Sequence, residues 1–102
     1  MNNELLAKLL ELCRLDNQIT WADDDTDKQI LLYIKNGVKF IKDKGGVKDT
    51  DFEEGGKANA LLLAYVRRAR SGDLSTFEQD YLSDIIDLQI DFDIESGAAT
   101  DE

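Results

Sequence analysis

The feature that most constrains this chain is a set of apolar residues that recur with the period of an α-helix in its first half. They are spaced by four, four and three positions, which places them on one face of a helix. These residues are Ile30, Ile34, Val38 and Ile41. An acidic run at residues 23–27 precedes them, and negative charge stabilises the N-terminal end of a helix. We predict a helix of about twenty residues here, ended by the glycine pair 45–46.

Three further segments have helical spacing of their apolar residues, so we predict an all-α protein. They are residues 4–15, 57–70 and 75–87. The chain has no proline, and its seven glycines lie mostly where helices are expected to end. The predicted fold is a small four-helix domain with a long loop, residues 46–56, between its second and third helices. The side chains expected to fill the core are Leu9, Ile30, Ile34, Val38, Ile41, Leu61, Leu62, Tyr65, Phe77, Tyr81 and Ile85.

The last thirty residues differ from the rest of the chain in charge and in apolar spacing. Residues 73–102 contain ten Asp or Glu and no cation, whereas the preceding residues contain twelve of each sign. From about Leu88 the apolar residues alternate with polar ones, and this period of two favours a strand over the competing helix. A single short strand is not stable alone. We therefore expect an extended segment at 88–94 that needs a partner edge, closing a helical domain of residues 1–95, and a disordered tail at 96–102.

The overall charge and the residue types exclude several classes of function. A formal net charge of −10 argues against a nucleic-acid-binding surface, because phosphate backbones select cationic patches. The basic cluster of Arg67, Arg68 and Arg70 fits the C-terminal end of a helix equally well. The chain has no histidine, so an imidazole base or metal ligand cannot be built, and it has no glycine-rich phosphate loop. We expect a protein that is not an enzyme and that uses no cofactor or metal.

Four local features allow both a structural and a functional interpretation. Cys13 lies on an apolar helix face, which favours a small buried hydrophobe over a reactive thiol. The aspartates of residues 23–27 lack the glycine and glutamate of an EF-hand loop, so a solvated helix start is favoured over a calcium site. The carboxylates of residues 49–54 fit a solvated surface, and nothing in their spacing marks an acid–base pair. Trp21 either packs between the first two helices or is an exposed interface anchor.

The compartment is predicted from cysteine content and hydropathy. One cysteine cannot form an internal disulfide, which fits a reducing environment. The sequence contains no run of the roughly 20 apolar residues that a membrane span requires, and its start lacks the cations of a signal peptide. We expect a soluble protein of the cytosol with no membrane partner.

Two stretches of the sequence together resemble a known family. One is ALLLAYVRRAR at residues 60–70, and the other is TFEQDYLSDIIDLQIDF at residues 76–92, where two aromatic residues four positions apart precede an Ile-x-x-Leu ending. With the leucine-rich first helix and the acidic start of the second, they are similar to the small head-to-tail connector, or adaptor, proteins of long-tailed bacteriophages. The resemblance covers roughly residues 3–94, as a pattern of helices with a loose C-terminal signature.

The resemblance implies a structural role in the virion, at the head-to-tail interface, after assembly in the host cytoplasm. Subunits of that family form a ring, usually of about twelve copies, below the portal protein. The ring extends the DNA channel and gives a second head-completion protein or the tail a place to dock. Acidic character suits a channel through which DNA slides without specific binding. The residues implied to contact the portal are Leu88, Ile90, Phe92 and Ile94. Those implied to contact the next ring are Val47, Asp49, Asp51 and Phe52. Their loop is more acidic than the family pattern, which leaves open whether it faces the channel or the next protein.

A function of a different class fits the acidic residues as well. A small regulatory or inhibitor protein that mimics DNA would block a basic partner with a stripe of carboxylates. Asp80, Asp84 and Asp87 would form such a stripe on the predicted fourth helix. The two hypotheses differ in gene position, because an adaptor gene should lie between capsid and tail genes.

Overall fold

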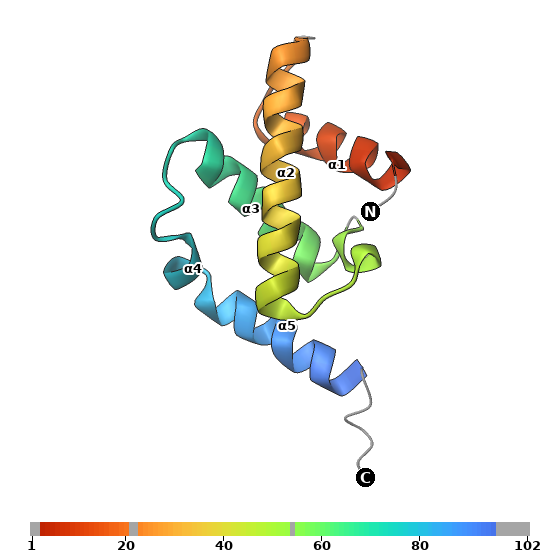
Figure 1. Ribbon diagram of the computed structural model, residues 1–102, viewed down its shortest axis with the longest axis vertical. Helices are drawn as coiled ribbons and strands as arrows, with labels where there is room; N and C mark the ends of the chain where they lie inside the picture. Colours follow the sequence, from red (N-terminus) through yellow and green to blue (C-terminus); the bar gives the residue numbers. More distant parts are fainter. Residues whose placement is uncertain (1–2, 21–22, 54, 96–102) are drawn as a thin grey trace.

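The structure is a computed structural model that describes residues 3–20, 23–53 and 55–95 (Figure 1). Its elements are α1 (Asn3–Asp16), α2 (Asp24–Gly45), the 3-10 helix η1 (Asp49–Phe52), α3 (Lys57–Arg70), α4 (Phe77–Asp80) and α5 (Leu82–Glu95). These residues contain helices and no strand, so the prediction of an all-α protein is confirmed. Four of the helices are long, and α4 is a single short turn. Trp21 and the expected tail at 96–102 lie outside the described residues.

Helix α2 forms the long axis of the molecule, and α1, α3 and α5 pack against it (Figure 1). Its start is fixed by Asp23, whose carboxylate accepts hydrogen bonds from the backbone N–H of Asp25, at 3.4 Å, and from the hydroxyl of Thr26. Its end is fixed by Gly46, which has a φ of 70° and donates its N–H to the carbonyl of Lys42. The aspartate run therefore caps a helix, as the sequence predicted.

The core lies where the apolar faces of α1, α2 and α3 meet, and α4 and α5 complete it at the C-terminal end of α2. Nine of the expected core side chains are buried, and these are Leu9, Ile30, Ile34, Val38, Ile41, Leu61, Leu62, Phe77 and Ile85. The other two, Tyr65 and Tyr81, are partly buried and pack against them. Phe40 completes an aromatic cluster with Tyr65 and Phe77, whose ring centroids are 5.3 to 5.9 Å apart. T-shaped and tilted pairs of this kind add to the free energy gained by burial.

The loop between α2 and α3 is tied to the core. Val47 and Phe52 are buried, and Phe52 is fully so. The buried Asn59 amide donates a hydrogen bond of 2.9 Å to the Phe52 carbonyl, which satisfies both polar groups. The backbone N–H of Lys48 donates to a carboxylate oxygen of Asp51 at 2.7 Å. The predicted loop exists, but it is folded around a 3-10 turn.

The prediction of an extended segment at 88–94 is wrong, because α5 continues as a helix to Glu95. Ile85 and Leu88, three positions apart, are both buried, and this spacing suits a helix face but not one face of a strand. The Gln89 side chain also donates a hydrogen bond of 2.7 Å to the backbone carbonyl of Lys44 at the end of α2. Tertiary contacts along α5 therefore outweigh the period-two pattern and the β-branched residues.

The predicted fourth helix is divided in two. Tyr81 lies between α4 and α5 with a φ of −111°. Thr76, which precedes α4, makes no side-chain capping bond and instead donates its hydroxyl to Asp80 at 3.0 Å. The break lets Phe77 enter the aromatic cluster while α5 turns across the C-terminal end of α2 (Figure 1).

Candidate functional site

The side of α5 opposite its buried face exposes a row of large aliphatic side chains. Leu82, Ile86 and Ile90 are spaced by four positions, which places them one turn apart on a helix. Their exposed fractions are 48%, 43% and 51%, whereas that of the neighbouring Leu88 is 5%. We call the three residues the docking stripe. Such a row is unusual on the surface of a helix, because branched aliphatic side chains usually face a core.

Carboxylates lie on the side of α5 that faces α3. Asp84 and Asp87 are exposed, and Asp91, one turn further, forms an ion pair of 2.9 Å with Lys57 of α3. This pair raises the pKa of Lys57 through the hydrogen bond and the charge of Asp91. It also holds the second half of α5 against α3. Asp84 and Asp87 line a hollow with Lys57 and Arg67, so the acidic side of α5 faces α3 while the docking stripe faces away from it.

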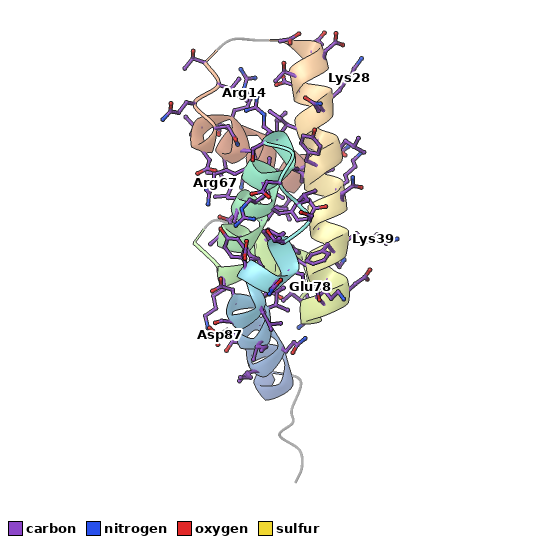
Figure 2. All side chains as sticks on the ribbon, turned by 90° about the vertical axis from the view of Figure 1, so that its left-hand side faces the viewer. Arg14, Lys28, Lys39, Arg67, Glu78 and Asp87 are labelled. Atoms are coloured by element: carbon purple, nitrogen blue, oxygen red, sulfur yellow. The ribbon has the colours of Figure 1, made fainter. Side chains whose placement is uncertain are left out.

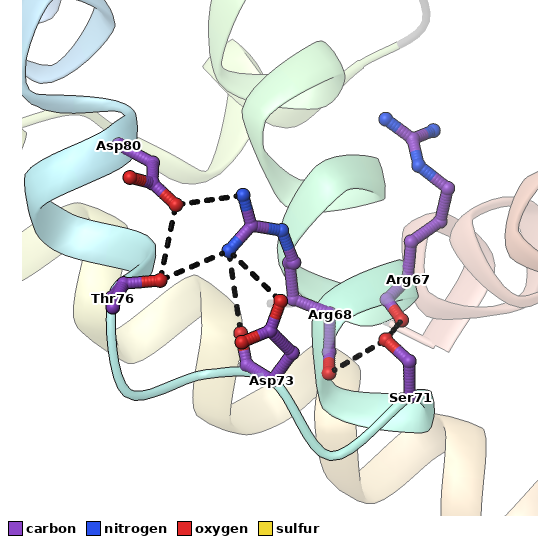
Figure 3. Close-up of polar contacts among 6 residues, drawn as sticks. All are labelled: Arg67, Arg68, Ser71, Asp73, Thr76 and Asp80. Carbon is purple, nitrogen blue, oxygen red and sulfur yellow. Dashed lines mark hydrogen bonds and ion pairs between the residues drawn. The ribbon is translucent and has the colours of Figure 1, made fainter.

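An arginine at the end of α3 holds the segment that leads into α5 (Figure 3). The Arg68 guanidinium forms a 2.8 Å hydrogen bond to Asp80, and contacts the backbone carbonyl of Asp73 at 3.3 Å and the hydroxyl of Thr76 at 3.4 Å. It also lies 5.5 Å from the centre of the Tyr81 ring. The hydrogen bonds from Arg68 and Thr76 keep the pKa of Asp80 below its ordinary value. Arg68 therefore fixes the connection between α3 and α5, while its neighbour Arg67 forms an ion pair of 2.7 Å with Asp16 of α1.

The four residues expected to contact the portal do not share one environment in the structure. Leu88 is buried against the end of α2, and Ile90 belongs to the docking stripe. Phe92 and Ile94 lie on the last turns of α5, and their side chains are outside the described part of the structure. Leu82 and Ile86 were not among the residues expected from the sequence. Their four-residue spacing with Ile90 indicates one face of a helix, but the alternating pattern favoured a strand there.

The four residues expected to contact a next ring lie in and around η1. Val47 and Phe52 are core residues, so their side chains are not exposed to another protein in this conformation. Asp51 is partly exposed and holds the Lys48 backbone, and the side chain of Asp49 lies outside the described part. The structure therefore does not bring these four together as one exposed surface.

A second surface, which the sequence analysis did not single out, runs along α2. Four lysines share one edge of this helix at spacings of seven, four and three residues. They are Lys28, Lys35, Lys39 and Lys42, and we call them the lysine edge. Where it passes α1 there is a groove of about 430 Å³. The groove is lined by Leu6, Lys35, Val38, Lys39, Lys42 and Asp43.

The described residues show no arrangement suited to catalysis by a metal or thiol. No group of three or more His, Cys, Asp or Glu side chains among them could hold a metal ion. Burial raises the pKa of the Cys13 thiol to about 12, so it stays protonated and unreactive. In the same part of the chain no helix is long and apolar enough to cross a bilayer.

Comparison of the chain with protein-family models, with curated proteins and with solved structures found no match.

Proposed function

We propose that this protein is a structural adaptor of the head-to-tail connector type. It forms a ring between the phage portal and the next head-completion or tail protein, and the ring extends the DNA channel. The observation that carries this proposal is the docking stripe on α5. A protein that joins other proteins needs an exposed apolar surface, whereas an enzyme needs a reactive site. The described residues of this chain form an exposed apolar surface.

The docking stripe supplies part of the free energy that assembly requires. Complete burial of a Leu or Ile side chain contributes about 1.5–3 kcal/mol, and the three residues are each about half exposed. Covering them would therefore contribute roughly 2–4 kcal/mol before any charged contact is counted. Repeated around a ring, contacts of this size give a stable assembly from subunits that associate weakly in pairs.

The charge of the chain supports the same role. A net charge of −10 makes the channel of such a ring repel the phosphate backbone, so DNA passes without specific binding. The proposed location is the virion, at the head-to-tail interface, after assembly in the host cytoplasm. The proposed partners of each subunit are the portal, a second head-completion or tail protein, and other copies of the chain.

The alternative of a DNA-mimicking inhibitor gains less support from the geometry. Of the three carboxylates that were expected to form the mimicking stripe, Asp80 is engaged by Arg68 at 2.8 Å. Asp91, which extends the same side of the helix, is engaged by Lys57. A protein that imitates a row of phosphates needs these charges free for a basic partner.

The proposal is tested by deleting the gene from the genome that encodes it and imaging the lysate by electron microscopy. We expect DNA-filled heads and separate, complete tails to accumulate. Mass spectrometry of purified wild-type particles should find the chain in several copies per particle. Normal joined particles in the deletion strain would refute the adaptor function, and so would the absence of the chain from purified virions.

A further inference from the structure

We propose that the lysine edge of α2, with the groove beside it, binds an acidic amphipathic helix of a different protein. The proposal rests on the proposed function, because it gives a chemical identity to one of the two proteins that an adaptor joins. The docking stripe of α5 is left for the other partner.

The lysine edge has the spacing of a surface on which a second helix packs. With Leu32 it forms a line spaced by four, three, four and three positions, namely Lys28, Leu32, Lys35, Lys39 and Lys42. Alternation of threes and fours keeps side chains turned toward a helix that lies alongside. All five are exposed, and Leu32 is 55% exposed. The line is about 21 Å long at 1.5 Å per residue, so a partner helix of about fourteen residues covers it.

The groove adds an apolar surface beside this line. Val38, which is 8% exposed, and the partly buried Leu6 line it where α1 meets α2. Lysines outnumber carboxylates among its lining residues, because Asp43 is set against three residues of the lysine edge. Apolar side chains beside a basic row select a helix that has an apolar line next to an acidic one.

Three lysines of this edge carry charge that the subunit does not neutralise. Lys57 and Arg67 of α3 form ion pairs with carboxylates at 2.9 and 2.7 Å. Within the described residues, Lys28, Lys35 and Lys39 form no such pair. Lys28 and Lys39 project away from the body of the molecule (Figure 2). A net charge of −10 repels acidic proteins overall, and the lysine edge is a local exception that directs their approach.

The structure favours a helix of another protein over two other occupants. In a second copy of this chain, Asp84 and Asp87 face α3, where they line a hollow with Lys57 and Arg67, so α5 does not offer its carboxylates outward. A nucleic acid would place phosphates against the lysines but would leave Leu32 without an apolar contact. Its long charged backbone would also be repelled by the rest of an acidic chain.

Fluorescence anisotropy of labelled peptides, titrated with the full-length protein, tests the proposal. The probe is a synthetic helical peptide of about 21 residues, or three heptads, with one line of leucines flanked by glutamates and alanine elsewhere. Its matched control has the same sequence with lysine in place of each glutamate. A DNA duplex and vesicles of phosphatidylserine and phosphatidylcholine, used in the same titration, represent the other two classes of anionic partner.

Three variants locate the site. Lys35→Glu with Lys39→Glu reverses the charge of the edge, and Lys35→Arg with Lys39→Arg preserves it. Lys8→Glu with Lys48→Glu makes the same change of charge at exposed positions that do not line the groove. Because all these side chains are exposed, each variant is expected to fold, which circular dichroism checks.

We expect the acidic peptide to bind wild type with a dissociation constant below about 1 mM at low salt, and more weakly as salt screens the charges. The basic peptide should bind at least about tenfold more weakly. Lys35→Glu with Lys39→Glu should weaken binding of the acidic peptide by about tenfold or more, whereas the arginine variant should keep the wild-type affinity. Lys8→Glu with Lys48→Glu should lose less than the variant at the edge.

Failure of the acidic peptide to bind would overturn the proposal, and so would equal binding of the two peptides. Equal losses in the edge variant and in its matched control would place the site elsewhere. Tighter binding of the DNA duplex or of the vesicles than of the acidic peptide would assign the edge to a partner of another class.

The two proposals fail separately. If the acidic peptide binds at the lysine edge but particles form normally in the deletion strain, the binding site stands and the adaptor function is wrong. If the deletion strain accumulates unjoined heads and tails but the peptide does not bind, the adaptor function stands and the binding site is wrong.

Discussion

At Gly37 the helices α2 and α3 pack so closely that no side chain fits between them. A methyl group there would lie 2.7 Å from a Leu62 methyl carbon and 2.8 Å from the Tyr65 ring. Leu62 is fully buried and Tyr65 is held by the aromatic cluster, so neither can move aside freely. Alanine would gain up to about 1 kcal/mol in helix propensity and lose about 1–3 kcal/mol through overpacking.

We therefore expect Gly37→Ala to lower the free energy of unfolding by about 1–2 kcal/mol, measured by urea denaturation. The neighbouring Asn36 is exposed, so Asn36→Ala should change stability by no more than about 0.5 kcal/mol. A Gly37→Ala protein as stable as wild type would show that the two helices are not packed at this distance.

Cys13 links the burial of a single thiol to the pH dependence of folding. Burial first, and then the charge of Asp16, raise the pKa of the thiol from an ordinary value of 9.0 to about 12, while Arg67 acts in the opposite direction. Between these values the native state keeps a proton that the unfolded state has lost. The contribution to stability is thus present below about pH 9 and is lost as the pH rises toward 12.

We expect wild type to lose more stability between about pH 8 and pH 10 than Cys13→Ala does, in urea titrations of both proteins. The comparison cancels tyrosine and lysine ionisation, which is common to the two. The native thiol should also fail to react with Ellman's reagent near pH 8 and should react at once in denaturant. Rapid reaction of the native protein would place Cys13 at the surface.

Among the elements, α2 and α3 could be predicted from the sequence, and α5 could not. The apolar face, the aspartate cap and the closing glycine of α2 all indicate the same helix, so local and tertiary preferences agree. In part of α5 the spacing of the apolar residues fits both the period of a helix and that of a strand. The helix prevails because Ile85 and Leu88 can then pack together against the end of α2, a contact that no local pattern reveals.

Leu88 and Ile90 give a direct test of the helical register of α5. In a strand both side chains would lie on one face, whereas in the helix Leu88 is 5% exposed and Ile90 is 51% exposed. We expect Leu88→Ala to lower the free energy of unfolding by about 2–4 kcal/mol. Ile90→Ala should lower it by no more than about 0.5 kcal/mol in dilute protein. Equal losses in urea denaturation would contradict the helix.

For the whole molecule, the sequence predicted how many long helices there are but not which surfaces they expose. The four-residue spacing of the docking stripe and the helical spacing of the lysine edge can both be read along the chain. The groove cannot, since it exists only where Leu6 of α1 comes to lie beside Val38 of α2. The burial of Phe52 could not be predicted either, since this residue lies in a charged loop. In the structure it is fully buried, and its backbone carbonyl accepts a hydrogen bond from Asn59.

The central claim is that the docking stripe of α5 joins the proteins of an assembly, and complementation of the gene deletion tests it most directly. The deletion strain would express wild type, Ile86→Ser with Ile90→Ser, or Leu15→Ser, the last a matched control because Leu15 of α1 is 70% exposed and outside the stripe. Electron microscopy then counts the DNA-filled heads that carry tails. We predict that wild type and Leu15→Ser restore joining. The stripe variant should reduce it by about tenfold or more, since about 1.4 kcal/mol of lost contact changes an equilibrium tenfold. Full restoration by a folded stripe variant would contradict the account.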